Sequence, residues 1–210
     1  MIRIVIADDH AVVRQGLKQI VSEGPGMTVV GEAGSSQELI ALIQKQRCDV
    51  VVLDITMPGR SGIEALKELR QERPRLPILV LSMHPEEQYA IRALKTGAAG
   101  YLTKETAPEE LVRAIQKVVA GGRYISSSLA EKLATSLTTD MEKPPHELLS
   151  EREYQVLCLI ASGKAVSEIA EELSLSVKTI STYRARILEK MGMKNNAELM
   201  HYAMQNRLVT

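Results

Sequence analysis

The chain has 210 residues, of which 45% are hydrophobic and 25% are charged, a composition typical of globular proteins and not of disordered ones. Its length allows two small domains of roughly 100 residues each. The apolar run Ile2–Ala7 is followed by Asp8 and Asp9 and is too short for a signal peptide or a membrane span, so we expect a cytoplasmic protein.

The formal net charge is zero, but the charges are unevenly distributed along the chain. Segment 176–194 contains five basic residues and one acidic residue, a net charge of +4, whereas segment 148–175 contains two basic and five acidic residues, a net charge of −3. Basic charge is therefore concentrated on one predicted helix, a pattern compatible with nucleic-acid binding. A basic helix face is more often only a solvated surface, so this feature needs support from other residues.

Up to about residue 122, short apolar segments rich in β-branched residues alternate with amphipathic stretches. This alternation predicts five βα units around a parallel sheet. The predicted strands are Ile2–Ala7, Thr28–Glu32, Val50–Leu53, Ile78–Leu81 and Gly100–Leu102. The predicted helices are Val12–Val21, Ser36–Lys45, Gly62–Gln71, Glu86–Thr96 and Pro108–Ala120. At the start of the last helix, Thr106 and Glu109 predict a capping box.

The remainder of the chain has helical periodicity, interrupted by one polar segment. Ser126–Thr138 predicts a helix, and Thr139–Glu147, with two prolines and three acidic residues, predicts an exposed linker. Four helices follow: one that begins with a capping box at Ser150 and Glu153 and ends at Gly163, then Val166–Leu173, one capped by Ser176 that ends at Met191, and Asn196–Gln205. The predicted domains are therefore 1–122, a linker with a helix over 123–147, and an all-helical domain over 148–210.

Cys48 and Cys158 lie among apolar neighbours and show no metal-ligand spacing. We expect two buried free thiols with neither a disulfide nor a zinc site.

Polar residues follow the strands of the first domain. Asp8 and Asp9 come after the first strand, Asp54 after the third, Ser82 after the fourth and Lys104 after the fifth. Ligands bind at the carboxyl ends of parallel strands, and the flavodoxin-type order 2-1-3-4-5 would bring the three carboxylates into one pocket. Mg²⁺ would relieve their mutual repulsion. The pattern thus favours phosphoryl transfer onto Asp54, although any one of these acids alone would more often be structural.

The first 122 residues resemble the receiver domains of two-component response regulators. The matching stretches are IADDH (Ile6–His10), LDITMPG (Leu53–Gly59), LSMH (Leu81–His84) and GAAGYLTK (Gly97–Lys104). The resemblance implies a flavodoxin-like fold with Asp54 as phosphoacceptor. It also implies Mg²⁺ held by Asp9, Asp54 and the Thr56 carbonyl, with Asp8 acting through water.

The same resemblance implies that Ser82 and Tyr101 form a switch pair, with Lys104 contacting the phosphoryl group. The Ser82 hydroxyl would donate to a phosphoryl oxygen, and the Tyr101 ring would turn into the space that is vacated. Apart from the resemblance, Tyr101 would be a partly buried packing residue. For His10 and His84 we favour surface or loop roles over metal ligation.

In the second domain, Ile180, Ile187, Leu188 and Met191 fall on one face of the third predicted helix, which leaves the opposite face for solvent or DNA. That face includes Ala185. A helix of this kind lies in the major groove with its first residues on base edges. The candidates for base contacts are Lys178, Ser181 and Thr182, and the candidates for phosphate contacts are Thr179, Arg186 and Lys190.

Residues Leu149 to about Arg207 resemble the NarL/FixJ class, which has a LuxR-type helix-turn-helix. The matching stretches are LSEREYQVLCLIASGK and EIAEELSLSVKTISTYRARILEKMG. Ser181 stands where many members have lysine, and Ala165 and Val166 replace polar residues, so we expect weak binding by a single domain. The resemblance implies a sensor histidine kinase and promoter DNA as partners, RNA polymerase as a further candidate, and a homodimer after phosphorylation.

Three other functions were weighed. An aspartyl phosphatase of the haloacid dehalogenase type would have Asp-x-Asp after the first strand, whereas here the two acids are adjacent. A flavin-binding module would have a phosphate loop rich in Ser, Thr and Gly, and Asp8 and Asp9 would repel its phosphate. A regulator without phosphorylation control would not need Asp54, Ser82 and Lys104 together. We therefore expect a DNA-binding regulator that is not an enzyme.

Overall fold

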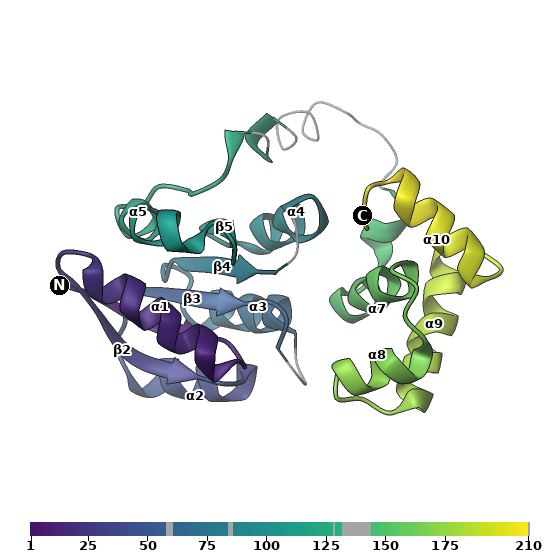
Figure 1. The fold of residues 1–210 in the computed structure, drawn as a ribbon, viewed down its shortest axis with the longest axis horizontal. Coiled ribbons are helices and arrows are strands. Elements are labelled where there is room, and N and C mark those ends of the chain that lie inside the picture. The colour runs from purple at the N-terminus through teal and green to yellow at the C-terminus, as the bar shows by residue number, and fades with distance from the viewer. Residues whose placement is uncertain (58–60, 84–85, 128, 132–143, 210) are drawn as a thin grey trace. The chain divides into compact units, whose positions relative to one another are not determined.

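The computed structural model describes residues 1–210 except 58–60, 84–85, 128, 132–143 and 210 (Figure 1). The chain divides into two compact units, Met1–Ala134 and Thr135–Thr210. None of the helices in the described part of the chain combines the length and the apolar character needed to cross a bilayer.

The first unit is built on a five-stranded sheet of order β2-β1-β3-β4-β5 in which all neighbouring strands are parallel. The strands are β1 (Ile2–Ala7), β2 (Met27–Ala33), β3 (Val50–Asp54), β4 (Ile78–Ser82) and β5 (Gly100–Thr103). The predicted flavodoxin-like order 2-1-3-4-5 is confirmed. It places β1 beside β3, so the residues that follow these two strands lie at the same end of the sheet.

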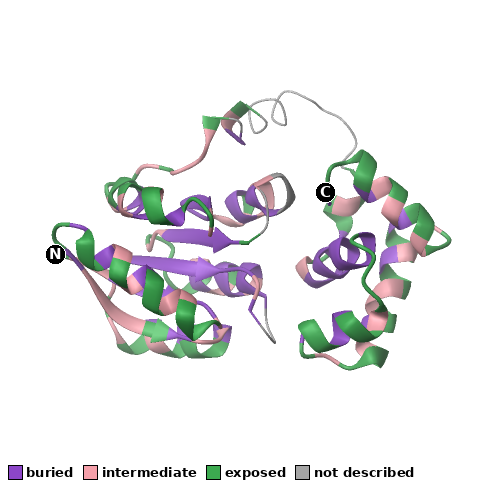
Figure 2. Ribbon diagram, viewed as in Figure 1, coloured by how far each residue is buried: buried purple, intermediate pink, exposed green. Residues whose placement is uncertain are grey.

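Helices cover both faces of this sheet. They are α1 (Ala11–Glu23), α2 (Ser36–Lys45), α3 (Gly62–Glu72), α4 (Glu86–Thr96) and α5 (Ala107–Val119). Helices α1 and α5 contact each other on one face, while α3 contacts both α2 and α4 on the other (Figure 1). This two-sided covering explains why β3 and β4 are buried along their whole lengths (Figure 2) and why their sequences are apolar without alternation up to their last residues, Asp54 and Ser82.

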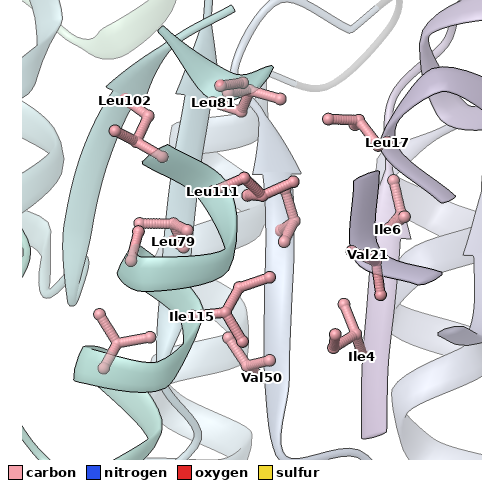
Figure 3. Packing of buried hydrophobic residues seen from close by; sticks show 14 of the residues in the cluster. Ile4, Ile6, Leu17, Val21, Val50, Leu79, Leu81, Leu102, Leu111 and Ile115 are labelled. Carbon is pink, nitrogen blue, oxygen red and sulfur yellow. The ribbon is translucent and has the colours of Figure 1, made fainter. Parts of the chain in front are cut away.

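The core beneath α1 and α5 is made of alternate strand residues. Ile4 and Ile6 of β1 point to the same face as Val50 of β3 and Leu79 of β4, and they form one buried cluster with Leu111 of α5 (Figure 3). These five side chains are fully buried. Burying a side chain of this size contributes about 1.5–3 kcal/mol to stability. This layer therefore holds the strands in place, including the residues at their carboxyl ends.

The capping box predicted at Thr106 and Glu109 is wrong. Thr106 does precede α5, but its backbone has φ −87° and ψ −12°, which is already helical, and its side chain makes no capping hydrogen bond. A capping side chain needs extended backbone to reach the third amide of the helix. The Thr106 hydroxyl instead donates to the carbonyl oxygen of Thr103 at 3.3 Å.

After α5 the chain returns to the sheet and pairs with β5. The Tyr124 amide donates to the Ala99 carbonyl at 3.0 Å, and the Tyr101 amide donates to the Tyr124 carbonyl at 3.1 Å. Gly100 permits this approach, because a Cβ atom there would lie 2.6 Å from the Tyr124 oxygen. Of the helix predicted over 126–138, residues 127 and 129–131 are helical, and the other described residue, Ser126, precedes them. Residues 128 and 132–138 lie outside the described part.

In its described residues the second unit has helices joined by turns, as predicted for 148–210. It consists of the 3₁₀ helix η1 (Pro145–Leu148) and the helices α7 (Glu151–Ala161), α8 (Val166–Glu172), α9 (Val177–Met191) and α10 (Asn196–Gln205). Helix α7 contacts α8, α9 and α10, and α8 also contacts α9. The apolar face of α9 is confirmed, because Ile180, Ile187 and Met191 are buried and Leu188 is half-buried.

Local sequence explains where these helices begin and end. The predicted capping box is formed, since Ser150 Oγ accepts from the Glu153 amide and the Glu153 carboxylate accepts from the Ser150 amide. Ser176 caps α9 through the Thr179 amide. The turn between α8 and α9 requires a left-handed residue, Ser174, with φ +53°. This turn fixes the direction in which α9 leaves α8.

Both cysteines are free thiols, but only Cys158 is buried. Cys48 is half-buried, which corrects the expectation that both are buried, and burial raises the pKa of its thiol to about 11.

Candidate functional site

Three residues from different strands meet at the carboxyl end of the sheet. Lys104, just after β5, places Nζ 2.6 Å from Oδ2 of Asp8 and 2.7 Å from Oδ2 of Asp54. Both carboxylates are only 1% exposed. The structure therefore brings together the residues that the strand-end pattern singled out, with the lysine bridging two of the acids.

The electrostatics of this cluster follow from its burial. Burial raises the pKa of the Asp54 carboxyl, and the nearby Lys104 ammonium and the Thr56 amide, which donates to Oδ1 at 2.9 Å, offset this effect only in part. Burial by itself would lower the pKa of Lys104, but Asp54 and Asp8 reverse this and hold that pKa above its ordinary value. The lysine is therefore charged at neutral pH.

Asp9 and His10 extend the cluster toward solvent. The His10 ring places Nδ1 2.9 Å from Oδ1 of Asp9 and 3.5 Å from Oδ1 of Asp8, and its side chain is 67% exposed. The His10 amide also donates to Oδ1 of Asp8 at 2.8 Å. A loop role was expected for His10, and its ring in fact lies against the acidic pair. His84, for which a similar role was expected, lies outside the described residues.

The carboxylates offer ligand atoms for a hard cation. Within the described part of the chain, the buried Oδ2 of Asp8 and Oδ1 of Asp9 are contacted only by the Lys104 ammonium at 2.6 Å and by the His10 ring nitrogen at 2.9 Å. Asp8, Asp9 and His10 place one ligand atom each within 4.8 Å of one another. Carboxylate oxygens that converge in this way are suited to Mg²⁺, which prefers oxygen ligands.

Two supporting residues were missed by the sequence analysis. Gly62, the first residue of α3, lies against the end of β3, and a Cβ atom there would be 2.2 Å from the Asp54 carbonyl oxygen. Arg14 of α1 donates from Nη1 to the Asp8 carbonyl at 2.7 Å. A glycine in the first turn of a helix is a weak sequence signal, and the Arg14 contact is set by packing that sequence does not reveal.

Of the two residues expected to form a switch pair, Ser82 is bonded to the backbone of Lys104. The Ser82 carbonyl accepts from the Lys104 amide at 2.7 Å, and the Ser82 side chain is fully buried. Tyr101 is also fully buried, whereas sequence reasoning without the family resemblance expected partial burial. Its strand continues directly to Lys104.

In the second unit, the predicted DNA-binding residues lie on the open side of α9. Thr179 is half-buried. The other six are exposed, namely Lys178, Ser181, Thr182, Ala185, Arg186 and Lys190. A hollow of about 340 Å³ is lined by Ser176, Lys178, Thr179, Thr182, Tyr183 and Arg186. Tyr183 was not singled out from the sequence, because the 3.6-residue period places it between the two faces.

The hydroxyls of this face are engaged with their own helix. Ser181 donates to the Val177 carbonyl at 2.9 Å and Thr182 donates to the Lys178 carbonyl at 2.9 Å. Each hydroxyl oxygen keeps lone pairs that can accept a hydrogen bond from a base amino group. The Lys190 ammonium is also engaged, since it donates to Glu153 at 2.6 Å.

Comparison with family models gives two matches. Residues 4–116 match the model for the response regulator receiver domain, and residues 147–203 match the model for bacterial regulatory proteins of the luxR family. The two matches together span most of the chain and fall in the two units of the structure.

Similar proteins and solved structures cover nearly the full length. The chain is 37% identical to the response regulator UvrY of Escherichia coli K12, over 99% of this chain and 96% of UvrY. It is 38% identical to the response regulator GacA of Pseudomonas aeruginosa, over 100% and 98%. RcsB from Salmonella enterica serovar Typhimurium, solved bound to the promoter rprA with the phosphomimetic BeF3⁻, is 30% identical with a TM-score of 0.65, over 97% of this chain and 99% of RcsB.

Proposed function

Since this chain belongs to the two-component response regulators of the NarL/FixJ class, which join a receiver domain to a LuxR-type DNA-binding domain, we propose that Asp54 accepts a phosphoryl group and that this modification controls DNA binding by α9. The observation that carries the proposal is the contact of one lysine with two buried carboxylates, Asp8 and Asp54, at the end of the sheet.

The proposed transfer begins with an oxygen of Asp54. This carboxylate oxygen attacks phosphorus, a new P–O bond forms, and the bond between phosphorus and the donor breaks, so that the donor leaves with its electron pair. Lys104 then exchanges its bond to Asp54 for one to a phosphoryl oxygen. The Ser82 hydroxyl donates to another phosphoryl oxygen, and movement at Ser82 is transmitted to the buried ring of Tyr101.

The residues at the site fit a bound Mg²⁺. Asp9, Asp54 and the Thr56 carbonyl would hold it directly and Asp8 through water, and the ion would offset negative charge on the transferring phosphoryl group. The fit rests on the convergence of the Asp8 and Asp9 carboxylate oxygens, which lie within 4.8 Å of each other among the described residues.

For the second domain, we propose that Lys178, Ser181 and Thr182 contact base edges in the major groove. Thr179 and Arg186 would contact phosphates, and Ala185 would lie against the bases. The support is that these residues share the open side of α9, with a hollow beside Lys178 and Arg186. The RcsB structure solved with a promoter supports DNA binding by this chain.

We also propose the partners that this function requires. A sensor histidine kinase would supply the phosphoryl group in the cytoplasm, where chromosomal DNA lies, and RNA polymerase is a candidate partner at promoters. A homodimer would form after phosphorylation. The support for dimerisation is that a solved RcsB structure contains two dimers bound to two DNAs. We assign the chain no separate enzymatic activity.

The proposal is tested by labelling the full chain with radioactive acetyl phosphate in the presence of Mg²⁺. The unmodified chain should be labelled, and Asp54→Asn should not. The matched control is Asp49→Asn, a carboxylate just before the other end of β3 that is bonded to Arg3, and it should keep the label. Mg²⁺-dependent labelling of Asp54→Asn would place the acceptor elsewhere.

A further inference from the structure

Two basic side chains of α9 form hydrogen bonds with other helices of their own domain. Arg184 donates from Nε to Oδ1 of Asn196, the first residue of α10, at 2.6 Å. Lys190 donates from Nζ to Oε2 of Glu153, in the first turn of α7, at 2.6 Å. Helix α9 is therefore linked to α10 and to α7 by charged hydrogen bonds, which are about twice as strong as neutral ones.

The acceptor of the Lys190 bond is almost completely buried. Glu153 is 3% exposed, and the same Oε2 also accepts from the Ser150 amide at 2.8 Å. Burial would raise the pKa of this carboxyl, but the bonds from Lys190 and Ser150 hold that pKa below its usual range. Glu153 is thus ionised at neutral pH and relies on Lys190 for its counter-charge.

Two other basic side chains of the DNA-facing surface have no such ion pair within the described residues. Lys178 and Arg186 are exposed, and in the described part of the chain their side chains form neither an ion pair nor a hydrogen bond. They can neutralise phosphates and release condensed counterions. Lys190 is already neutralised by Glu153, so placing the pair near DNA would release almost no net counterion.

We propose that Lys190 is a positioning residue, which sets the orientation of α9 on α7 through Glu153 and contributes to DNA recognition without contacting a phosphate. This inference rests on the proposed function of α9. It reassigns Lys190 from the phosphate contact expected from sequence. Moving Lys190 onto a phosphate would leave the buried Glu153 carboxylate without its counter-charge, which is strongly unfavourable.

The test compares Lys190→Met with the matched variant Arg186→Met on the same helix. Each full-length variant is titrated with two duplexes. One is selected from a random pool by the unmodified chain, and the other has a random sequence. The salt concentration is varied from roughly 50 to 200 mM, the range over which phosphate contacts change affinity strongly. Lys190→Met should weaken binding to the selected duplex about tenfold, the scale of coupling within one ion-pair network, and leave the salt slope on random DNA unchanged. Arg186→Met should reduce that slope by about 0.9.

A companion variant, Glu153→Gln, distinguishes positioning from simple loss of folding. It should weaken binding to the selected duplex as much as Lys190→Met, and the double variant should be no worse than either single one. Binding is measured at a temperature at which circular dichroism shows each variant fully folded. Loss of folding would instead weaken binding to both duplexes in equal proportion, and would overturn the inference.

The inference is also overturned if Lys190→Met reduces the salt slope on random DNA as Arg186→Met does, or if its effect adds to that of Glu153→Gln. Failure of the proposed function has a different signature. In that case neither Arg186→Met nor Thr182→Ala would change binding to any duplex.

Discussion

At the scale of single residues, the candidate phosphoacceptor site depends on one lysine that offsets two buried carboxylates. Lys104 is 11% exposed on its side chain and contacts Asp8 and Asp54 at 2.6 and 2.7 Å. The lysine reduces the repulsion between the two carboxylates, so the receiver domain can fold with Asp54 unmodified. It also means that Lys104 must release Asp54 when the aspartate is modified.

Replacing Lys104 with Met should therefore destabilise the receiver. Removing one partner of a buried ion pair costs about 3 kcal/mol or more, because two carboxylates are left facing each other. Addition of Mg²⁺ should restore about 2.7 kcal/mol at a concentration 100 times its dissociation constant. Thermal unfolding with and without Mg²⁺ measures both effects.

The control for this variant is Lys45→Met, an exposed lysine at the end of α2. It should change the free energy of unfolding by less than about 0.5 kcal/mol, with or without Mg²⁺. If Lys104→Met were as stable as Lys45→Met and gained nothing from Mg²⁺, the carboxylates would not depend on the lysine or bind the ion.

Thr182 offers a second test at this scale, on the DNA-facing side of α9. Its hydroxyl donates to Lys178 within the helix and can accept from a base. Thr182→Ala should relax preference at one base step, at a cost of about 1–3 kcal/mol on the selected duplex and almost none on random DNA. Competition binding against single-base variants of the duplex measures this. An equal loss on all sequences would remove Thr182 from the base-reading set.

Sequence could predict part of this residue-scale arrangement. Asp8, Asp54 and Lys104 each follow a different strand, and parallel topology then fixes where they meet. The bond between Lys190 and Glu153 could not be predicted, because it joins two residues 37 positions apart on different helices and depends on how these helices pack. The His10 ring was missed for a similar reason, since its direction is set by rotamer choice in a loop.

At the scale of elements, the strands and most helix limits follow from local sequence. Ser150 and Ser176 cap helices as predicted, because each has extended backbone at the cap. Thr106 has the same side-chain chemistry but helical backbone, so no cap forms. The residue pattern specifies which side chains can cap, and the approach of the preceding loop decides which ones do.

Helix α3 shows what an element contributes to the site. Its first residue, Gly62, packs against the backbone of Asp54 and Ile55, where a Cβ atom would come within 2.2 and 2.5 Å of backbone atoms. Gly62→Ala should therefore displace the end of β3, destabilise the chain by about 3 kcal/mol and slow labelling of Asp54. Urea unfolding and the rate of labelling by acetyl phosphate measure the two effects.

Gly16→Ala in α1 is the matched control, because nothing lies within 4 Å of the added Cβ atom. It should stabilise the helix by about 0.5–1 kcal/mol and leave labelling unchanged. A Gly62→Ala variant that behaved like Gly16→Ala would show that close packing of α3 on β3 is not needed.

At the scale of the whole molecule, the proposed control requires that phosphorylation of Asp54 change the affinity of the chain for DNA. A shift from mostly inactive to mostly active needs about 5.5 kcal/mol of differential stabilisation. Pairing of two chains on DNA can add to what one phosphoryl group supplies. Two α9 helices would then lie about one DNA turn apart, roughly 34 Å, on an inverted repeat.

Sedimentation of the full chain with and without beryllofluoride tests this expectation. The chain should be a monomer alone and a dimer with beryllofluoride, and Asp54→Asn should remain a monomer in both conditions. A chain that stays monomeric with beryllofluoride and binds its selected duplex as a monomer would contradict dimerisation. Phosphorylation would then have to act by releasing the second domain from the first.

The pairing of Tyr124 with β5 also bears on how the chain can be divided. An uncovered edge strand presents free amide and carbonyl groups to other chains and promotes aggregation. Tyr124 accepts from the Tyr101 amide and donates to the Ala99 carbonyl. A receiver fragment ending at residue 122 would expose these groups, whereas a fragment ending at residue 131 would keep them paired, so the shorter fragment should be the more prone to self-association.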